Sequence, residues 1–210
     1  MSEMSEAHKT DILQAAIVEF GRMGYAAAST NEIVRQAKVS KGLLFHYFTN
    51  KEKLYIACQT FILEQYAKYM VTNFKLETPD FFERIVYSLR KKMEFGIKNP
   101  SYLSLINHAW LLEGKDNPLQ RNEAEAIVLQ SVQVQGMQDF FEGVDTSRFR
   151  DGIDMAKVVY YTRLVMEAAW ARFMHLHNND AEAMVQNINQ YFTAAEEIAE
   201  LLKYGAYKPG

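Results

Sequence analysis

The chain has 210 residues, 49% of them hydrophobic and 23% charged, and its formal net charge is −3. This is the composition of an ordinary soluble globular protein, and the length suffices for one sizeable core or two small ones. No segment approaches 18 uncharged apolar residues, so we expect no membrane-spanning helix, and the polar N-terminus lacks the pattern of a signal peptide. Cys58 is the single cysteine, which excludes an internal disulfide and fits a cytoplasmic protein.

Apolar side chains recur at helical spacing along the whole chain, and no alternating run predicts a strand, so we expect an all-α fold. The first helix is predicted over residues 8–23. Its apolar stripe consists of Ile12, Ala16, Phe20 and Met23, and Gly24 suits the position just after its end.

Two very short helices follow, and each has a residue typical of a helix start. Ser29 with Glu32 forms a capping box before residues 30–37, and Ser40 precedes a second helix at residues 41–47. Two short helices separated by so tight a turn are typical of a helix-turn-helix, in which the second helix enters the major groove of DNA.

Two residues at the start of the second short helix favour DNA binding over packing alone. Lys41 is a cation in the first turn, where it opposes the helix dipole unless an external anion such as a phosphate binds there. Gly42 lets the backbone approach a partner closely. The alternative interpretation is a surface lysine beside a loose turn.

The distribution of charge agrees with a DNA-binding head. Residues 8–55 contain seven basic and four acidic side chains, whereas residues 56–210 contain 16 basic and 20 acidic side chains. The sign of the net charge therefore changes between the two parts, as expected for a head that binds DNA and a body that does not.

Long helices are predicted for the rest of the chain. Thr49 with Glu52 is a second capping box, and the helix after it meets no Pro or Gly. Three further helices begin where Pro follows Thr or Asn, at Pro79, Pro100 and Pro118. The predicted ranges are residues 51–74, 79–99, 100–114, 118–143, 152–177 and 181–204.

The helix predicted at residues 152–177 is apolar nearly all round, so every face of it needs to be covered. One side faces its own core, and the other needs a partner. The last helix, residues 181–204, has an apolar stripe of its own. Two such helices from each of two chains form an intersubunit four-helix bundle, so we expect a homodimer. The alternative is a helix buried centrally in a monomer.

Three neighbouring segments resemble the DNA-binding signature of the TetR family of transcriptional regulators. They are Ile33-Val34, residues 37–48 (AKVSKGLLFHYF) and residues 51–54 (KEKL). The resemblance covers about residues 9–54. It implies a double-stranded DNA operator as partner and the last two long helices as the dimer interface.

Three residues depart from the family pattern: Lys38 replaces the usual glycine of the turn, Val34 a usual alanine and Phe45 a common tyrosine. Lys38 should therefore adopt a left-handed conformation at some cost, and Phe45 lacks a hydroxyl that would contact a phosphate. By their positions in the motif, the residues expected to face DNA are Thr30, Ser40, Lys41, Gly42, Leu43, His46, Tyr47 and Lys51.

Between residues 51 and 177 the chain is rich in aromatic and Met side chains, which form core and also line pockets for hydrophobic ligands. We therefore expect a small hydrophobic effector. Glu167 interrupts the most apolar run, and its charge needs a partner: Arg163, Arg172 or a cationic ligand. With a neutral or acidic ligand, His108 or Arg172 would matter more. The predicted ligand contacts are Gln65, Tyr69, His108, Trp110, Glu113, Glu167 and Trp170.

Together these features predict a DNA-binding head at residues 1–50 and a ligand-binding, dimerising body at residues 51–210. The predicted function is a repressor that leaves its operator when the effector binds. The alternatives are a dimeric DNA-binding regulator without an effector, and a helical enzyme whose head resembles a DNA-binding domain by chance. We expect no cofactor or metal, since no phosphate loop, activated serine or Cys-x-x-Cys is present.

Overall fold

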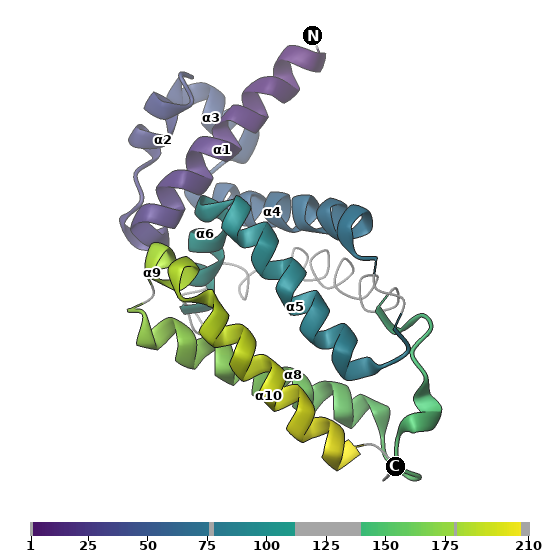
Figure 1. The fold of residues 1–210 in the computed structure, drawn as a ribbon. Coiled ribbons are helices and arrows are strands. Elements are labelled where there is room, and N and C mark those ends of the chain that lie inside the picture. Colours follow the sequence, from purple (N-terminus) through teal and green to yellow (C-terminus); the bar gives the residue numbers. More distant parts are fainter. Residues whose placement is uncertain (1, 76–77, 112–139, 179, 207–210) are drawn as a thin grey trace. The chain divides into compact units, whose positions relative to one another are not determined.

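The structure is a computed structural model that describes residues 2–75, 78–111, 140–178 and 180–206 (Figure 1). These residues form helices and include no strand, which confirms the predicted all-α fold. No helix within these ranges is long and apolar enough to span a membrane.

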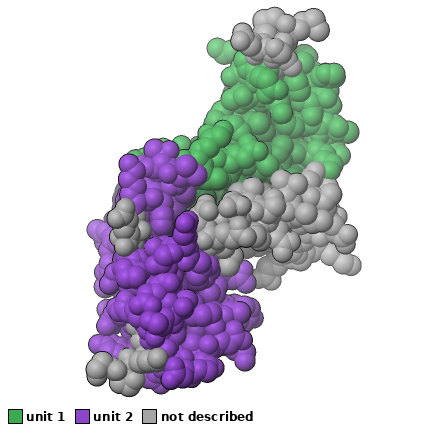
Figure 2. Space-filling view, turned by 90° about the vertical axis from the view of Figure 1, so that its right-hand side faces the viewer, with its two compact units in different colours: residues 1–69, 98–136 green, residues 70–97, 137–210 purple. Residues whose placement is uncertain are grey.

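The chain divides into two compact units (Figure 2). Unit 1 consists of residues 1–69 with 98–136, and unit 2 of residues 70–97 with 137–210. The predicted boundary at residue 50 separates proposed functions rather than compact bodies, and it remains a proposal. Of the helix predicted at residues 118–143, only residues 140–143 lie in the described part.

Unit 1 begins with α1 (Ser2–Ala27). Its predicted apolar stripe is confirmed for Ile12, Ala16 and Phe20, which are fully buried. It is wrong for Met23, which is 40% exposed. At Gly24 the backbone leaves helical geometry with φ 70° and ψ 170°, a conformation that glycine adopts without a steric penalty.

The two short helices are α2 (Thr30–Gln36) and α3 (Lys41–Phe48). Both predicted caps form: Ser29 Oγ accepts from the Glu32 amide at 3.4 Å, and Ser40 Oγ accepts from the Leu43 amide at 3.1 Å. Lys38 has a φ of 55° in the turn between the helices, as its place in the motif predicted.

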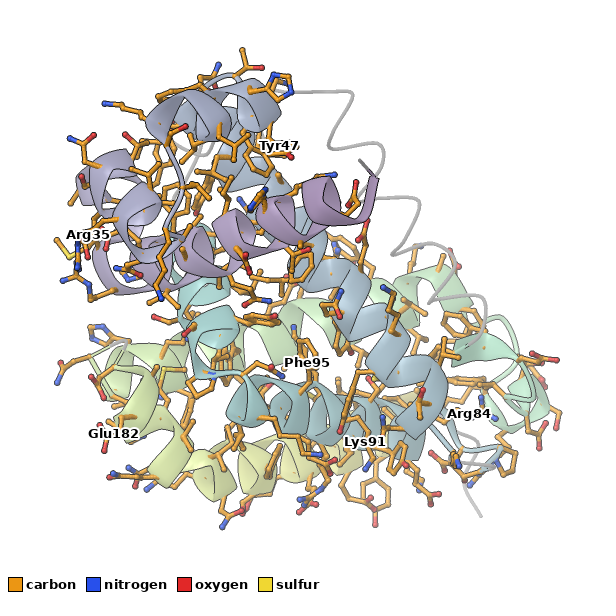
Figure 3. All side chains as sticks on the ribbon, turned by 90° about the horizontal axis from the view of Figure 1, so that it is seen from above. Arg35, Tyr47, Arg84, Lys91, Phe95 and Glu182 are labelled. Carbon is orange, nitrogen blue, oxygen red and sulfur yellow. The ribbon has the colours of Figure 1, made fainter. Side chains whose placement is uncertain are left out.

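The reciprocal half of the first capping box is not formed. The carboxylate of Glu32 accepts instead from Arg35 (labelled in Figure 3) and Gln36, and these hydrogen bonds lower the pKa of Glu32 to about 2. The amide of Ser29 donates at 3.0 Å to Glu19 Oε1 from α1, and Glu19 is only 1% exposed. A buried carboxylate of another helix thus completes the cap of α2.

The next helix is α4 (Lys51–Asn73), and it has no break. The prediction that Thr49 caps it is wrong by one residue. Thr49 has a φ of 59° and ends α3, whereas Asn50 Oδ1 accepts from the Lys53 amide at 2.8 Å. Asn is as good an N-cap as Thr, so the local sequence did not distinguish them.

Unit 1 also contains α6 (Pro100–Leu111), which begins at the predicted proline and packs on α1. Ser104 Oγ donates to the Gly21 carbonyl at 2.6 Å, and Gln14 Nε2 donates to the Tyr102 hydroxyl at 2.9 Å. A Cβ atom placed on Gly21 would lie 2.9 Å from the Ser101 carbonyl oxygen, so only glycine permits this approach.

We therefore expect Gly21→Ala to lower the free energy of unfolding by about 1–3 kcal/mol, because α6 must shift away from α1. Urea denaturation followed by circular dichroism measures the change. The matched control is Gly205→Ala in α10, where a Cβ atom would meet nothing within 4 Å. There alanine should stabilise the helix by about 0.5–1 kcal/mol. Equal stability of the two variants would show that α1 and α6 accommodate a Cβ atom at residue 21 without moving apart.

Unit 2 is built from α5 (Phe81–Lys98), α8 (Met155–Leu176), α9 (Ala181–Gln186) and α10 (Ile188–Ala206), with a short 3₁₀ turn, η3 (Thr146–Arg148). Its larger core is centred on Phe81, which packs against Phe82 and Phe149. A smaller cluster consists of Phe173, Met174, Met184 and Tyr191, where α8, α9 and α10 meet.

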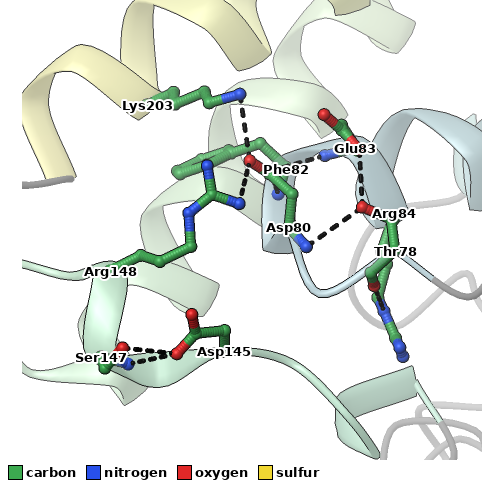
Figure 4. Close-up of polar contacts among 9 residues, drawn as sticks. All are labelled: Thr78, Asp80, Phe82, Glu83, Arg84, Asp145, Ser147, Arg148 and Lys203. Carbon is green, nitrogen blue, oxygen red and sulfur yellow. Dashed lines mark hydrogen bonds and ion pairs between the residues drawn. The ribbon is translucent and has the colours of Figure 1, made fainter. Parts of the chain in front are cut away.

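The start of α5 is fixed by Asp80 rather than by Pro79, which lies outside the helix (Figure 4). Asp80 Oδ1 accepts from the amides of Phe82 and Glu83, at 2.9 and 3.1 Å. Its Oδ2 forms ion pairs with Arg148 at 2.9 Å and Lys203 at 3.0 Å. Asp80 is 1% exposed, so one buried carboxylate holds together α5, η3 and α10.

The single helix predicted at residues 181–204 is in fact two helices. They meet at Asn187, whose side-chain amide donates to the Ala183 carbonyl at 2.9 Å and whose backbone has φ −108° and ψ 11°. Asn competes for backbone hydrogen bonds in this way, and this explains the break.

Candidate DNA interface and effector site

The two faces of α3 differ sharply. Leu44 and Phe48 are buried under α1 and α2, whereas Lys41, Gly42 and His46 are exposed and Tyr47 is half-buried. The second helix of the motif therefore turns a polar and aromatic face outward while its apolar residues fix its position in unit 1. This is the arrangement that direct contact with base edges requires.

Lys41 is held by a residue that the sequence did not single out. Its ammonium donates at 2.9 Å to Asn31 Oδ1 of α2, and both side chains are exposed. Asn31 thereby links α2 to the start of α3. The sequence does not reveal this hydrogen bond, because Asn31 and Lys41 are ten positions apart and lie in different helices.

The predicted phosphate-contacting residues lie around the ends of the short helices. Thr30 is the first residue of α2 and is half-buried. Ser40 uses an oxygen lone pair for its cap, so its hydroxyl hydrogen is still available to a phosphate oxygen. Leu43 is half-buried on α3. These positions are compatible with the predicted contacts, which remain a proposal.

Lys51 differs from a simple surface cation. Its ammonium donates at 3.0 Å to the Ala26 carbonyl at the end of α1 and lies 5.1 Å from the centre of the Tyr25 ring. Burial lowers the pKa of Lys51, and the charge of Glu19 opposes that shift. One of its three hydrogens is thus used inside unit 1, and the others are available for a phosphate.

The predicted effector contacts in unit 1 are dispersed. Gln65 and Tyr69 are half-buried on α4, and the ammonium of Lys98 lies 5.5 Å from the Tyr69 ring centre. His108 faces the end of α1, where its Nδ1 would be 3.6 Å from a Cβ atom on Gly24. The side chain of Trp110 and the whole of Glu113 lie outside the described residues.

In unit 2 both predicted contacts have partners within the protein. Glu167 Oε1 is 3.7 Å from Arg163 Nε, one turn earlier on α8, which confirms one of the two predicted arginine partners. Trp170 packs on Phe173 and Tyr191, with ring centres 5.6 and 5.0 Å away. Burial raises the pKa of Tyr191 to about 12.

Two surface grooves in the described part of the chain are lined by none of the predicted effector contacts. A groove of about 360 Å³ runs between α5 and α10, over Phe82, Val86 and Ala199. The other groove lies between α1 and the end of α2, beside Val18 and Lys38.

Comparison with known sequences agrees with the geometry of the head. Residues 12–58 match the family described as bacterial regulatory proteins, tetR family. The HTH-type transcriptional repressor SCO4008 of Streptomyces coelicolor is 40% identical over 50 residues. These residues make up 24% of this chain and 26% of that protein, so the match spans about a quarter of each.

Solved structures extend the likeness to the whole fold. A TetR family regulator from Chloroflexus aurantiacus superposes with a TM-score of 0.61 at 15% identity, over 97% of this chain and 95% of that one. FadR from Bacillus subtilis, solved in complex with stearoyl-CoA, gives 0.61 at 17% identity, over 94% and 98%. Residues 12–58 therefore match the tetR family of bacterial regulatory proteins in sequence, and the whole chain shares the fold of TetR family regulators.

Proposed function

We propose that this protein is a ligand-responsive repressor, a homodimer that binds an operator through α3 of each copy and leaves it when a small hydrophobic molecule binds the body. The observation that carries the proposal is the outward face of α3, where Lys41, Gly42 and His46 are exposed above a buried Leu44. Residues 8–55 carry seven basic and four acidic side chains, and this excess of positive charge favours binding to phosphates.

The dimer is supported by the exposed apolar face of α8. Tyr160, Tyr161, Leu164 and Val165 are 50%, 56%, 40% and 37% exposed in the single chain. These residues lie on one side of the helix, with Ala168 near the centre of that side. Leu201 and Tyr204 of α10 are each 72% exposed. A second copy of the chain would cover these side chains and form the predicted four-helix bundle.

Release from DNA is proposed to follow a population shift. In one conformation of the dimer, the two α3 helices are spaced by about one turn of DNA, roughly 34–36 Å. An effector that binds a different conformation more tightly shifts the dimer toward that conformation and so lowers its affinity for the operator. The loss of operator affinity cannot exceed the ratio of the effector's affinities for the two conformations. The unbroken α4, which starts directly after the motif, is suited to transmit such a change. FadR shows that the same fold accommodates stearoyl-CoA.

An electrophoretic mobility shift with the DNA upstream of the protein's own gene tests the proposal. Wild-type protein should bind, and cell extract should release it. Lys41→Ala should weaken binding by about 1–3 kcal/mol, because it removes a cation from the outward face of α3, and should relax the sequence preference at one position of each half-site.

The matched control is Lys68→Ala, which removes the same charge from an exposed position of α4 outside the motif. Its operator affinity should equal that of the wild type. Binding that extract leaves unchanged would favour a regulator without an effector, and no DNA binding at all would favour the unrelated enzyme.

A further inference from the structure

The groove between α5 and α10 in unit 2 has an apolar floor (both helices are labelled in Figure 1). Phe82 and Ala199, which are 2% and 5% exposed, belong to the larger core of this unit, and the half-buried Val86 packs against that core. The volume of about 360 Å³ lies at the lower end of the range of about 300–1,000 Å³ that is usual for ligand pockets. The groove therefore suits a small molecule with an apolar part.

Both cations that line the groove are already paired with carboxylates. At one end the guanidinium of Arg90 pairs with Glu196 and lies 4.6 Å from the centre of the Phe192 ring. At the other end the Lys203 ammonium is 3.0 Å from a carboxylate oxygen of Asp80, which is 1% exposed (Figure 4). An anionic ligand would have to displace one of these partners, so the groove is poorly suited to an anion.

Two further carboxylates line the groove, and neither is paired with a cation among the described residues. Glu83 lies in the first turn of α5, where the helix dipole favours a negative charge, and its Oε2 accepts from the Thr78 hydroxyl at 2.6 Å. The side chain of Glu200 on α10 is exposed, and Lys203, the cation one turn further along the helix, is paired with Asp80 instead. Glu200 is thus the carboxylate of the groove that the fold itself leaves uncompensated.

Three carboxylates and two cations consequently surround the apolar floor. We propose that this groove binds the effector and that the effector is a small hydrophobic cation. The ammonium group of the ligand donates to the Glu200 carboxylate, and the apolar part lies over Phe82, Val86 and Ala199. This inference rests on the proposed ligand response, and it names the site and the chemical class of the ligand.

The groove shares α10 with the proposed dimer interface. Glu200 lines the groove, whereas the neighbouring Leu201 and Tyr204 are each 72% exposed in the single chain and belong to the proposed interface. A ligand that contacts both α5 and α10 favours one spacing of these two helices. This preference is the differential affinity that a population shift of the dimer requires.

Isothermal titration calorimetry of the full-length protein tests the proposal with three probes of equal chain length: octylammonium, octanol and octanoate. Wild-type protein should bind octylammonium about fivefold or more tightly than either other probe, because only the ammonium forms an ion pair with a carboxylate. Glu200→Gln preserves the shape of the side chain and removes its charge. This variant should lose about fivefold in octylammonium affinity and keep the octanol affinity of the wild type.

The matched control is Glu197→Gln, which removes the same charge from an exposed position one turn earlier on α10 that does not line the groove. It should bind octylammonium like the wild type. The proposal is overturned if Glu200→Gln binds octylammonium as tightly as the wild type or if Glu197→Gln loses as much affinity as Glu200→Gln. It is also overturned if octanol or octanoate binds as tightly as octylammonium, or if octylammonium does not bind.

Operator release separates this inference from the proposed function. Octylammonium that binds through Glu200, with operator affinity changed neither by it nor by cell extract, supports the site and contradicts the ligand-responsive function. Cell extract that releases the wild type and Glu200→Gln equally, with no binding of octylammonium, supports the function and contradicts the site.

Discussion

Ala168→Glu should convert the proposed dimer into a monomer of 24.3 kDa and lower operator affinity by about 100-fold or more. Ala168 is exposed on α8, so a carboxylate there does not disturb the core of its own chain. In the dimer the same carboxylate would be buried against apolar side chains without a partner, which is costly. A monomer offers one α3 helix and loses the avidity of two half-sites.

Light scattering measures the mass, and the mobility shift measures operator affinity. Ala168→Ser is the matched control, because it is small and uncharged and should remain a dimer. Ala195→Glu is an instructive contrast: Ala195 is 1% exposed in the core of its own unit, so this variant should unfold rather than dissociate. Retention of the dimer by Ala168→Glu, or a wild-type monomer at micromolar concentration, would exclude the interface on α8.

Asp80→Asn should lower the free energy of unfolding by about 3 kcal/mol at neutral pH, because Arg148 and Lys203 lose their shared carboxylate. Asn still accepts hydrogen bonds from the first amides of α5, so the helix cap remains and the loss reports the ion pairs alone. Asp145→Asn is the control. The half-buried Asp145 carboxylate accepts hydrogen bonds from the amide and the hydroxyl of Ser147 in the same turn, and its removal should change stability by about 0.5 kcal/mol or less.

The effect of Asp80 should depend on pH in a defined direction. Desolvation raises the pKa of Asp80, but the hydrogen bond from the Glu83 amide and the charges of Lys203 and Arg148 outweigh it, so the pKa lies below 3.8. A carboxyl group with a lowered pKa stabilises the fold above its unfolded pKa, and this contribution is lost as the pH falls through the folded value. Urea denaturation should therefore show a constant difference between wild type and Asp80→Asn from pH 7 to 5, which shrinks below pH 3.8. A difference independent of pH would mean that the amide itself perturbs the core.

The helix starts of the DNA-binding motif were predictable because their causes are local. Ser29 and Ser40 each cap a helix through an amide three positions further along the chain, and the sequence alone reveals that spacing. Lys38 was recognisable in the same way, since the turn requires a positive φ at that position. At the start of α4 two good capping residues are adjacent, and the end of α3 decides that Asn50 rather than Thr49 is the cap.

The candidate effector contacts were less predictable because their surroundings depend on distant residues. His108 is predicted to face the interior of the body, whereas in the structure α6 packs on α1 and the His108 ring lies next to Gly24. Trp170 is predicted as a ring that contacts a ligand, whereas in the structure Tyr191 of α10, a residue 21 positions further along the chain, packs against it.

The hydrogen bond from the Ser29 amide to Glu19 has a consequence for how small a working fragment of this protein can be. A peptide of residues 29–54 would contain the whole DNA-reading segment, but the acceptor for its first amide would be missing, since it belongs to α1. Such a peptide would also lose the Ala26 carbonyl that anchors Lys51. The shortest autonomous fragment therefore begins with α1, and excising or grafting the motif without that helix removes part of what makes it fold.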